Sequence, residues 1–214
     1  MHLKFDLHVH TNHSPDSTIS PKDLIQKSKK FGIAPAITDH NSISAHKEFE
    51  NQSFIPGEEI LTFERYDLIG LYLTELIPVK TPFLEALDLI KSQGAISYLP
   101  HMFDITRKGC ADEKLAKKVD AIEIFNGRAF GDCNKKAEQF AEKNKKLKGV
   151  GSDTHFLFEF GKTYLELAGD FSDYFDNPKK FLKDLPKANY ATKNSPIYVR
   201  GTTRLFSILR KFKR

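Results

Sequence analysis

Short apolar runs alternate with helix-like stretches along this chain, and the alternation restricts the possible folds more than any other feature. Seven runs are expected to form strands, at residues 3–10, 34–38, 53–56, 67–73, 95–99, 121–125 and 149–152. Helices are expected between some of them, over residues 21–31, 81–93 and 132–145. Strand followed by helix, repeated, is typical of parallel strands wrapped by helices. The sequence therefore predicts an α/β fold in which the parallel strands form a barrel.

Two of the expected helices begin in the same way. Ser20 precedes Pro21, and Thr81 precedes Pro82. A hydroxyl side chain can accept a hydrogen bond from a free backbone N–H of the first turn, and proline suits the first helical position. Gly32 follows the first helix, where a left-handed backbone conformation commonly ends a helix.

Length and composition indicate a single domain without a membrane span. With 214 residues the chain can bury one sizeable core. No apolar stretch is long enough to cross a bilayer, and the first residues enter an expected strand without the apolar segment of a signal peptide. We therefore expect a cytoplasmic protein without a membrane span. Cys110 and Cys133 have no CxxC spacing, so neither a zinc ribbon nor a disulfide framework is indicated.

Charge is distributed unevenly along the chain. Residues 178–214 carry eleven Lys and Arg and one acidic residue, whereas residues 1–177 carry 27 acidic and 22 basic residues. We expect a catalytic core in residues 1–170 and a basic extension, packed on the same domain, in residues 171–214. Residues 204–214 have the pattern of an amphipathic helix whose apolar face would dock on the core. Its charges fit a solvated surface, a contact with nucleic acid, or a membrane surface.

The first expected strand ends in His8-Val9-His10, which places two imidazoles on the same face. Such a pair suits a metal ion better than a core, although a chain with eight histidines can contain it by chance. Further polar motifs follow other strand-like runs. They are Thr38-Asp39-His40, Gly57-Glu58-Glu59, Pro100-His101 and Ser152-Asp153-Thr154-His155. Because the carboxyl ends of barrel strands meet at one face, these side chains are expected to share one pocket.

The residue types in this pocket indicate its chemistry. Histidine with carboxylate is a ligand set for zinc, manganese or iron, whereas calcium and magnesium prefer oxygen alone. The candidate ligands are too many for one ion. Clustered ions can polarise a phosphoryl oxygen, lower the pKa of a bridging water and stabilise a leaving oxygen. Hydrolysis of a phosphate ester is therefore the favoured reaction class.

The ordered motifs resemble those of the PHP (polymerase and histidinol phosphatase) superfamily of metal-dependent phosphoesterases. The signatures of that superfamily are HxH, a following acid, TDH, GxE, an isolated histidine and SDxH. The matching positions here are His8-Val9-His10, Asp16, Thr38-Asp39-His40, Gly57-Glu58-Glu59, His101 and Ser152-Asp153-Thr154-His155. The resemblance implies a distorted seven-stranded (β/α)7 barrel, TIM-like and forming a single domain, with two or three divalent metal ions (Mn, Zn or Fe).

The resemblance also implies which residues bind the ions. The first ion would be held by His8, His10, Glu59 and Asp153, the second by Glu59 and His101, and the third by Asp16, His40 and His155. A bridging ligand needs two oxygens, which Glu59 has and an imidazole lacks. The choice of Glu59 over Glu58 rests on the GxE spacing. We expect Glu59, Asp153 and His10 to be catalytic.

One position departs from the superfamily pattern. Close relatives place a histidine shortly after the bridging glutamate, where this chain has Asp67. Aspartate binds the same ions, so we assign Asp67 to the second metal; the alternative is a turn residue before a strand. Asp39 is expected to orient ligands from outside the metal shell. The histidines outside the motifs, His2, His13 and His46, are expected to be structural or solvated.

Arginines in loops after the expected strands suit phosphate recognition, because a guanidinium can bind phosphate in a bidentate manner. Arg128 is the first candidate for substrate binding. Arg107, in the loop after His101, is the second, and Lys108 could act similarly. The alternative for each is an ordinary surface residue.

Three functions fit these features. The leading one is a phosphoesterase in which a metal-bridging hydroxide attacks a small phosphorylated substrate or a nucleotide. The second is a metal-dependent 3'–5' exonuclease or phosphodiesterase acting on short oligonucleotides. The third is a non-catalytic, metal-stabilised binding module, which the number of ligands disfavours because a structural site needs only about four. No obligate protein partner is implied.

Overall fold

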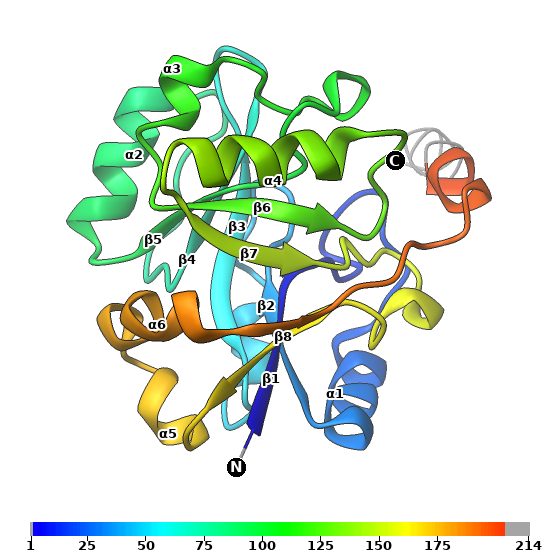
Figure 1. Ribbon diagram of the computed structural model, residues 1–214. Helices are drawn as coiled ribbons and strands as arrows, with labels where there is room; N and C mark the ends of the chain where they lie inside the picture. Colours follow the sequence, from blue (N-terminus) through cyan, green and yellow to red (C-terminus); the bar gives the residue numbers. More distant parts are fainter. Residues whose placement is uncertain (1, 204–214) are drawn as a thin grey trace.

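The computed structural model describes residues 2–203, whose central feature is a nearly closed barrel (Figure 1). Neighbouring strands follow one another in chain order. They are β1 (His2–Val9), β2 (Ile33–Ile37), β3 (Ile55–Leu61), β4 (Asp67–Leu71), β5 (Ile96–Leu99), β6 (Ala121–Asn126) and β7 (Leu147–Gly151). After β7 the chain returns to β1, where the Asp153 N–H donates to the His8 carbonyl at 2.8 Å and the His10 N–H to the Thr154 carbonyl at 3.0 Å. These two bonds close the ring of strands.

One strand runs against the others, which corrects the expectation of a uniformly parallel barrel. β4 pairs antiparallel with both β3 and β5, whereas the pairs β1–β2, β2–β3, β5–β6 and β6–β7 are parallel. The connection from β3 to β4 spans only residues 62–66. A connection this short can join antiparallel neighbours but is too short for a parallel crossover. The seven-stranded α/β barrel is otherwise the predicted one.

The longer helices pack on the outside of the barrel at the expected places. They are α1 (Pro21–Phe31), α2 (Phe83–Ser92) and α4 (Cys133–Lys143), with a short α3 (Glu113–Ala116) before β6. The Ser20 hydroxyl accepts a hydrogen bond from the Asp23 N–H, and Gly32 ends α1 with φ 63°, as predicted. The capping role expected for Thr81 is wrong. Its hydroxyl donates to the Pro78 carbonyl at 2.6 Å, and the carboxylate of Glu64 accepts from the first free N–H of α2.

The chain after β7 adds to the same core. It contains β8 (Tyr164–Ala168), α5 (Phe171–Tyr174), α6 (Pro178–Asp184) and β9 (Asn189–Ala191), and β8 pairs antiparallel with both β1 and β9. The Phe5 ring of β1 makes edge-to-face contacts with three aromatic rings from this part, those of Phe171, Tyr174 and Phe181. Residues 171–203 therefore pack on the barrel. The helix expected at 204–214 lies outside the described residues.

None of the helices between residues 2 and 203 is long and apolar enough to cross a membrane.

Candidate metal centre

The structure brings the polar motifs together at the carboxyl ends of the parallel strands. His8 and His10 come from the end of β1, and Glu59 lies within β3. Of the remaining ligand candidates, Asp67 is the first residue of β4, and the others follow β2, β5 and β7 or precede α1. All nine predicted ligands lie in one cluster: His8, His10, Asp16, His40, Glu59, Asp67, His101, Asp153 and His155. His13 and His46 lie apart from it, because His13 pairs with Glu48 and His46 with the Gly57 carbonyl.

Glu59 occupies the middle of this cluster. Its Oε1 lies 3.0 Å from His101 Nε2. Its Oε2 lies 3.2 Å from His10 Nε2, 3.4 Å from His8 Nε2 and 3.1 Å from His40 Nδ1. The first carboxylate oxygen thus faces one imidazole and the second faces three others. A bridging ligand requires this arrangement. Glu58 points the other way along the alternating strand and accepts from the Ile77 N–H at 2.9 Å.

The His8–His10 pair presents two Nε2 atoms to the same space. These atoms are 3.0 Å apart, and both side chains are fully buried. His10 Nδ1 lies 3.1 Å from the Ser14 hydroxyl, which donates to Asp39 at 2.8 Å. Ser14 therefore accepts from Nδ1–H, and the Nε2 lone pair of His10 is free to bind a cation. Asp39 accepts hydrogen bonds from the Thr11 N–H, the Thr11 hydroxyl and the Ser14 hydroxyl, so it contacts the cluster through Ser14.

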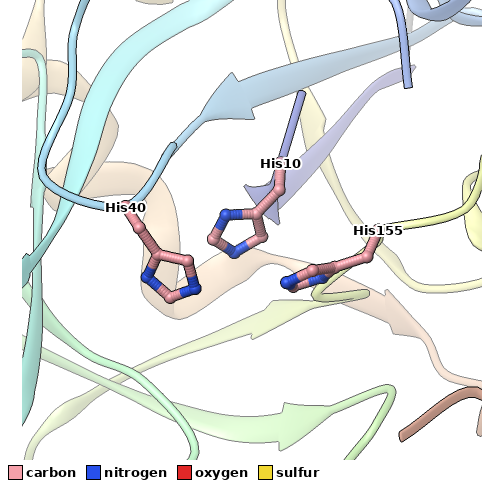
Figure 2. A group of neighbouring side chains, drawn as sticks. All are labelled: His10, His40 and His155. Atoms are coloured by element: carbon pink, nitrogen blue, oxygen red, sulfur yellow. The ribbon is translucent and has the colours of Figure 1, made fainter. Parts of the chain in front are cut away.

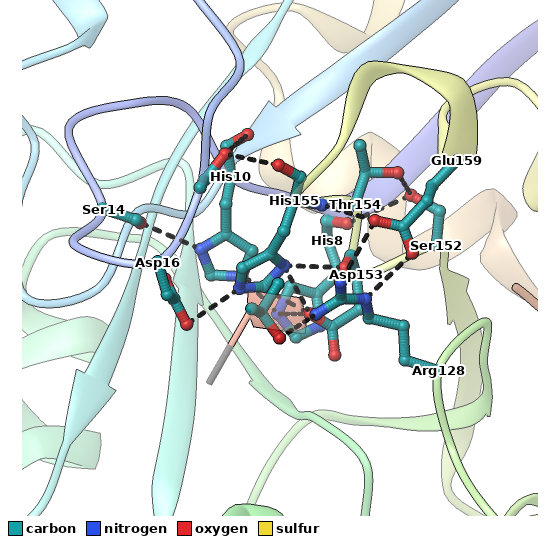
Figure 3. Close-up of polar contacts among 12 residues, drawn as sticks. His8, His10, Ser14, Asp16, Arg128, Ser152, Asp153, Thr154, His155 and Glu159 are labelled. Atoms are coloured by element: carbon teal, nitrogen blue, oxygen red, sulfur yellow. Dashed lines mark hydrogen bonds and ion pairs between the residues drawn. The ribbon is translucent and has the colours of Figure 1, made fainter. Parts of the chain in front are cut away.

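A second group of imidazoles, His10, His40 and His155, converges beside this pair (Figure 2). Asp16 completes it, since its Oδ2 lies 3.1 Å from His155 Nε2 and 3.6 Å from His40 Nε2. His155 Nδ1 donates to the Asp153 carbonyl at 2.9 Å, so its Nε2 also faces the cluster. Figure 3 shows Asp16 and His155 facing each other in this group.

Two further carboxylates face the cluster, and each has one buried oxygen without a hydrogen-bond partner among the described residues. Asp153 Oδ1 lies 3.7 Å from His10 Nε2 and 3.8 Å from His8 Nε2, while its Oδ2 contacts Arg107 and accepts from Asn126. Asp67 is 3% exposed, and its Oδ2 lies 4.0 Å from His101 Nε2. Asp67 is the first residue of β4 and is buried, so it is not the exposed turn residue of the alternative interpretation.

The charges in the cluster favour a bound cation. Burial raises the pKa of Glu59, but the charges of His40 and His8 outweigh burial and hold it well below its usual range. Burial likewise opposes ionisation of Asp153, and Arg107 with His8 holds its pKa well below the usual range. Asp67 differs, because burial and the charge of Glu59 raise its pKa to about 6. The ionised carboxylates of Glu59 and Asp153 therefore lie against the imidazoles of the cluster.

The surroundings shift the pKa values of His8 and His10 in opposite directions. Burial and the charges of His155 and His40 lower the pKa of His10 to about 3. Burial also opposes protonation of His8, but the surrounding carboxylates raise its pKa well above the usual value. Two imidazoles whose Nε2 atoms touch cannot both carry a proton there. The pair therefore holds at most one shared proton, or a cation in its place.

These residues fit divalent metal ions. Three sets of ligand atoms lie within 4.8 Å of one another: His8, His10 and Asp153; His8, Glu59 and His101; His10, His40 and His155. Asp153 Oδ1, a buried carboxylate oxygen without a hydrogen-bond partner among the described residues, faces the same space. Mixed imidazole and carboxylate donors are those that zinc, manganese and iron accept. Two of the candidate ligands, His101 (φ 30°) and Asp153 (φ 56°), have left-handed backbone conformations, which histidine and aspartate adopt more often than most non-glycine residues.

The cluster opens into a cavity of about 650 Å³. Besides ligand candidates, its lining includes Arg107, Lys108, Arg128 and Arg200. The Arg128 side chain is 2% exposed, and its Nε and Nη2 donate to Glu159 at 2.9 and 3.2 Å (Figure 3). Glu159 thus occupies the bidentate edge that a phosphate would use. Arg107 contacts Asp153 and donates to Asn126 at 3.2 Å, closer to the ligand cluster.

Some residues of the site were not expected from the sequence. Glu123 is fully buried in β6 beside His8, and its place inside an apolar run concealed it. Glu159 is buried and pairs with Arg128 at 2.9 Å. Arg200 lines the cavity and pairs with Asp104 at 3.0 Å, from a segment without a motif. For Glu123 the available signal was an acid within an otherwise apolar strand.

Comparison with known proteins agrees with this site. Residues 6–60 match the family model of the PHP domain, and residues 131–189 match the model described as PHP-associated. The uncharacterized protein MJ0417 of Methanocaldococcus jannaschii is 39% identical over 175 residues, which cover 78% of this chain and 71% of that protein. The uncharacterized protein MJ1587 of the same organism is 36% identical over 142 residues, covering 58% and 82%. The chain belongs to the PHP family.

Solved structures share the fold at low sequence identity. PsfC from Pseudomonas syringae PB-5123 aligns over 100% of this chain and 99% of its own, with a TM-score of 0.68 and 14% identity. A two-domain protein of Bacteroides vulgatus, described as containing a predicted PHP-like metal-dependent phosphoesterase, covers 84% of this chain and 64% of its own (TM-score 0.62, 19% identity). An amidohydrolase of Chromobacterium violaceum with bound sulfate covers 71% and 87% (TM-score 0.56, 15% identity). At these identities the likeness concerns the fold.

Proposed function

We propose that this PHP-family chain is a metal-dependent phosphoesterase that hydrolyses a phosphate ester of a small phosphorylated substrate or a nucleotide. The observation that carries the proposal is the position of Glu59. Its two oxygens lie within 3.4 Å of four imidazoles, beneath a cavity lined also by Arg107, Lys108 and Arg200. Membership of the family supports a metal-dependent hydrolase, and the cationic lining favours an anionic substrate.

Two or three divalent ions, with Mn, Zn and Fe as candidates, would be held by three neighbouring ligand sets, the first two of which share Glu59. These sets are His8, His10, Glu59 and Asp153; Glu59, Asp67 and His101; Asp16, His40 and His155. Bound ions of this kind activate water and neutralise the charge on a phosphate. Glu59, Asp153 and His10 lie where the first set meets the others, so they are the proposed catalytic residues.

Water is the proposed nucleophile, because no lining side chain among residues 2–203 is activated for attack. Thr106 and Thr203 supply the hydroxyl groups of the lining. Thr106 donates to Asp104 at 2.6 Å, and Thr203 donates to the Val199 carbonyl at 3.1 Å, so neither is paired with an imidazole. Cys110 is fully buried, and burial raises the pKa of its thiol to about 11. A thiolate nucleophile is therefore disfavoured.

Phosphate binding is assigned to Arg107 and Lys108, with Arg128 behind them. Arg107 makes one contact with Asp153 and one with Asn126, which leaves further N–H donors of its guanidinium for a phosphate. Its side chain is 19% exposed, and it lines the cavity. Arg128 retains less donor capacity, since Glu159, Thr203 and the Val199 carbonyl contact its guanidinium. We therefore rank Arg107 above Arg128, the reverse of the ranking from sequence.

A panel of phosphomonoesters, phosphodiesters and short oligonucleotides, assayed with Mn²⁺, Zn²⁺, Fe²⁺ and Mg²⁺ in turn, tests the proposal. Free phosphate from monoesters is the expected product. Glu59→Gln should lose most of the activity and part of the metal content, whereas Glu58→Gln, the neighbouring buried glutamate outside the cluster, should retain both. Full activity and metal content in Glu59→Gln would contradict the scheme.

The same panel separates the alternatives. Stepwise shortening of an oligonucleotide without release of phosphate from monoesters would favour the 3'–5' exonuclease. Metal binding without turnover of any substrate would favour the non-catalytic module. A contact of nucleic acid with the basic residues 204–214 concerns a segment outside the described residues. Deletion of residues 210–214 would test it, since loss of cationic contacts flattens the salt dependence of binding.

A further inference from the structure

Glu123 is a buried carboxylate directly behind the ligand cluster, and it is none of the nine predicted metal ligands. It lies in the middle of β6, on the face of the strand that points into the barrel, and is fully buried. A buried glutamate is costly unless its oxygens accept hydrogen bonds. Its partners therefore indicate why β6, otherwise apolar, contains an acid at this position.

Both oxygens of Glu123 contact predicted metal ligands. Oε1 lies 3.1 Å from His8 Nδ1. Oε2 accepts from the backbone N–H of His101 at 2.7 Å. Oε2 already accepts from two N–H groups and Oε1 faces Nδ1 of His8, so this carboxyl group acts as an acceptor and neutral His8 carries its proton on Nδ1. The Nε2 atom of His8 is then directed at His10 and Glu59. One carboxylate thus fixes the tautomer of His8 and the backbone from which His101 projects.

A short chain of hydrogen bonds extends this control to a third ligand. Asn126 Nδ2 donates to Glu123 Oε2 at 2.8 Å and to Asp153 Oδ2 at 2.9 Å. Asp153 then directs its other oxygen, which has no partner among residues 2–203, toward the cluster. The ligands touched by Glu123 and Asn126 belong to two of the proposed ion sites, those around His8 and around His101.

The contact between Glu123 and His8 depends on a residue without a side chain at one position of β7. Gly151, at the end of β7, faces the pair: a Cβ atom there would lie 2.3 Å from Glu123 Oε1 and 2.4 Å from the Cβ of His8. Any larger residue would force the two side chains apart. Gly151 and Glu123 lie on neighbouring strands and together define the position of the His8 ring.

We propose that Glu123 is a positioning residue of the metal centre, which holds His8 in its Nδ1-protonated tautomer and couples the His8 and His101 ion sites through one carboxylate. The inference rests on the metal centre of the proposed function. Glu123 itself touches no substrate in this scheme. Loss of such a hydrogen bond to a metal-binding histidine typically weakens metal binding about 10- to 100-fold.

The ¹⁵N chemical shifts of the His8 ring in the metal-free, full-length protein provide the first test. A proton on Nδ1 is expected, whether or not Nε2 also carries one in the absence of an ion, and an unprotonated Nδ1 would overturn the proposal. This measurement uses the wild-type chain, so it does not depend on whether a variant folds or on whether any ion binds.

Glu123→Gln provides the second test, because an amide must turn its NH₂ group toward either His8 or the His101 N–H, and each orientation replaces an acceptor with a donor. Titration with Mn²⁺ and Zn²⁺ by calorimetry should show affinity about 10- to 100-fold below wild type. Glu58→Gln is the matched control and should bind like wild type. Equal affinity and stoichiometry in Glu123→Gln would overturn the inference, whereas failure of the wild-type chain to bind either ion would overturn the proposed function instead.

Discussion

At the scale of single residues, Asp67 shows how a reversed strand brings a candidate ligand to the cluster. β4 runs opposite to its neighbours, so its first residue lies at the same edge as the last residues of β5, where His101 follows. Asp67→Ala should therefore lower the number of bound ions by about one while the sites around His8 and His40 keep theirs. Elemental analysis after equilibration with Mn²⁺ measures this directly. Asp120→Ala, at the amino end of β6, is the control; an unchanged count in Asp67→Ala would return Asp67 to a structural role.

The buried carboxyl group of Glu58 leads to a prediction about how stability depends on pH. Burial raises its pKa from 4.5 to about 7. The folded state therefore binds a proton that the unfolded state has lost over this range, and stability decreases as pH rises from about 4.5 through 7. A shift of this size corresponds to about 3 kcal/mol. Glu58→Gln should reduce this part of the pH dependence in chemical unfolding at pH 5 and pH 8. If the free energy of unfolding changed by the same amount between pH 5 and pH 8 in both proteins, burial would not raise the pKa of Glu58.

At the scale of strands and helices, much of the architecture could be predicted and two parts could not. The runs of β1, β2, β5, β6 and β7 and the ends of α1 are visible in the sequence because apolar side chains and capping residues are local signals. The direction of β4 depends on the five-residue connection from Leu61 to Asp67, which is a property of two strands together. β8 and β9 were missed because short, half-buried strands such as 164–168 show no clear apolar run.

The ligand residues could be predicted for the same local reason, whereas their supports could not. HxH, TDH, GxE and SDxH are short motifs, and each ends near a strand. Glu123 contacts His8 across 115 positions of sequence, and Arg128 contacts Glu159 across 31. Such pairs exist only once the barrel has formed. The sequence also offered no reason to rank Arg107 above Arg128 as a phosphate-binding residue, because that ranking depends on the contact between Arg128 and Glu159.

Gly151 gives a prediction that belongs to the packing of β7 against β1. Gly151→Ala should disrupt the His8–Glu123 contact, since the added carbon would meet the Cβ of His8 and a carboxylate that His101 and Asn126 hold in place. We expect weaker metal binding, by roughly tenfold or more, measured by titration with Zn²⁺. Gly32→Ala is the control: it has open space but φ 63°, so it should lose about 1 kcal/mol of stability and keep its metal affinity. Equal metal affinity in both variants would contradict the packing argument.

At the scale of the whole molecule, the cavity depends on segments from both ends of the chain. Closure of β7 onto β1 brings Asp153 to His8. Glu159 accepts from the His155 and Phe156 N–H groups and from Arg128, and Arg128 contacts the Val199 carbonyl. In Figure 1 this last described segment lies near the arrowheads of β6 and β7. The wall of the cavity is therefore assembled only in the complete fold.

Because the ligands come from segments separated by more than a hundred residues, binding of ions should stabilise the whole barrel. An ion that binds only the folded state, at about 100 times its dissociation constant, adds about 2.7 kcal/mol per site. For a domain of this size, that corresponds to a rise in Tm of roughly 5–10 °C per occupied site. We expect Mn²⁺ and Zn²⁺ to raise the Tm of chelator-treated protein, measured by differential scanning calorimetry, and EDTA to reverse the rise. Mg²⁺ should raise it less, because imidazoles are poor ligands for that ion. A Tm unaffected by all three ions would mean that the cluster does not bind metal in the folded chain, since no ligand set of this kind assembles in the unfolded one.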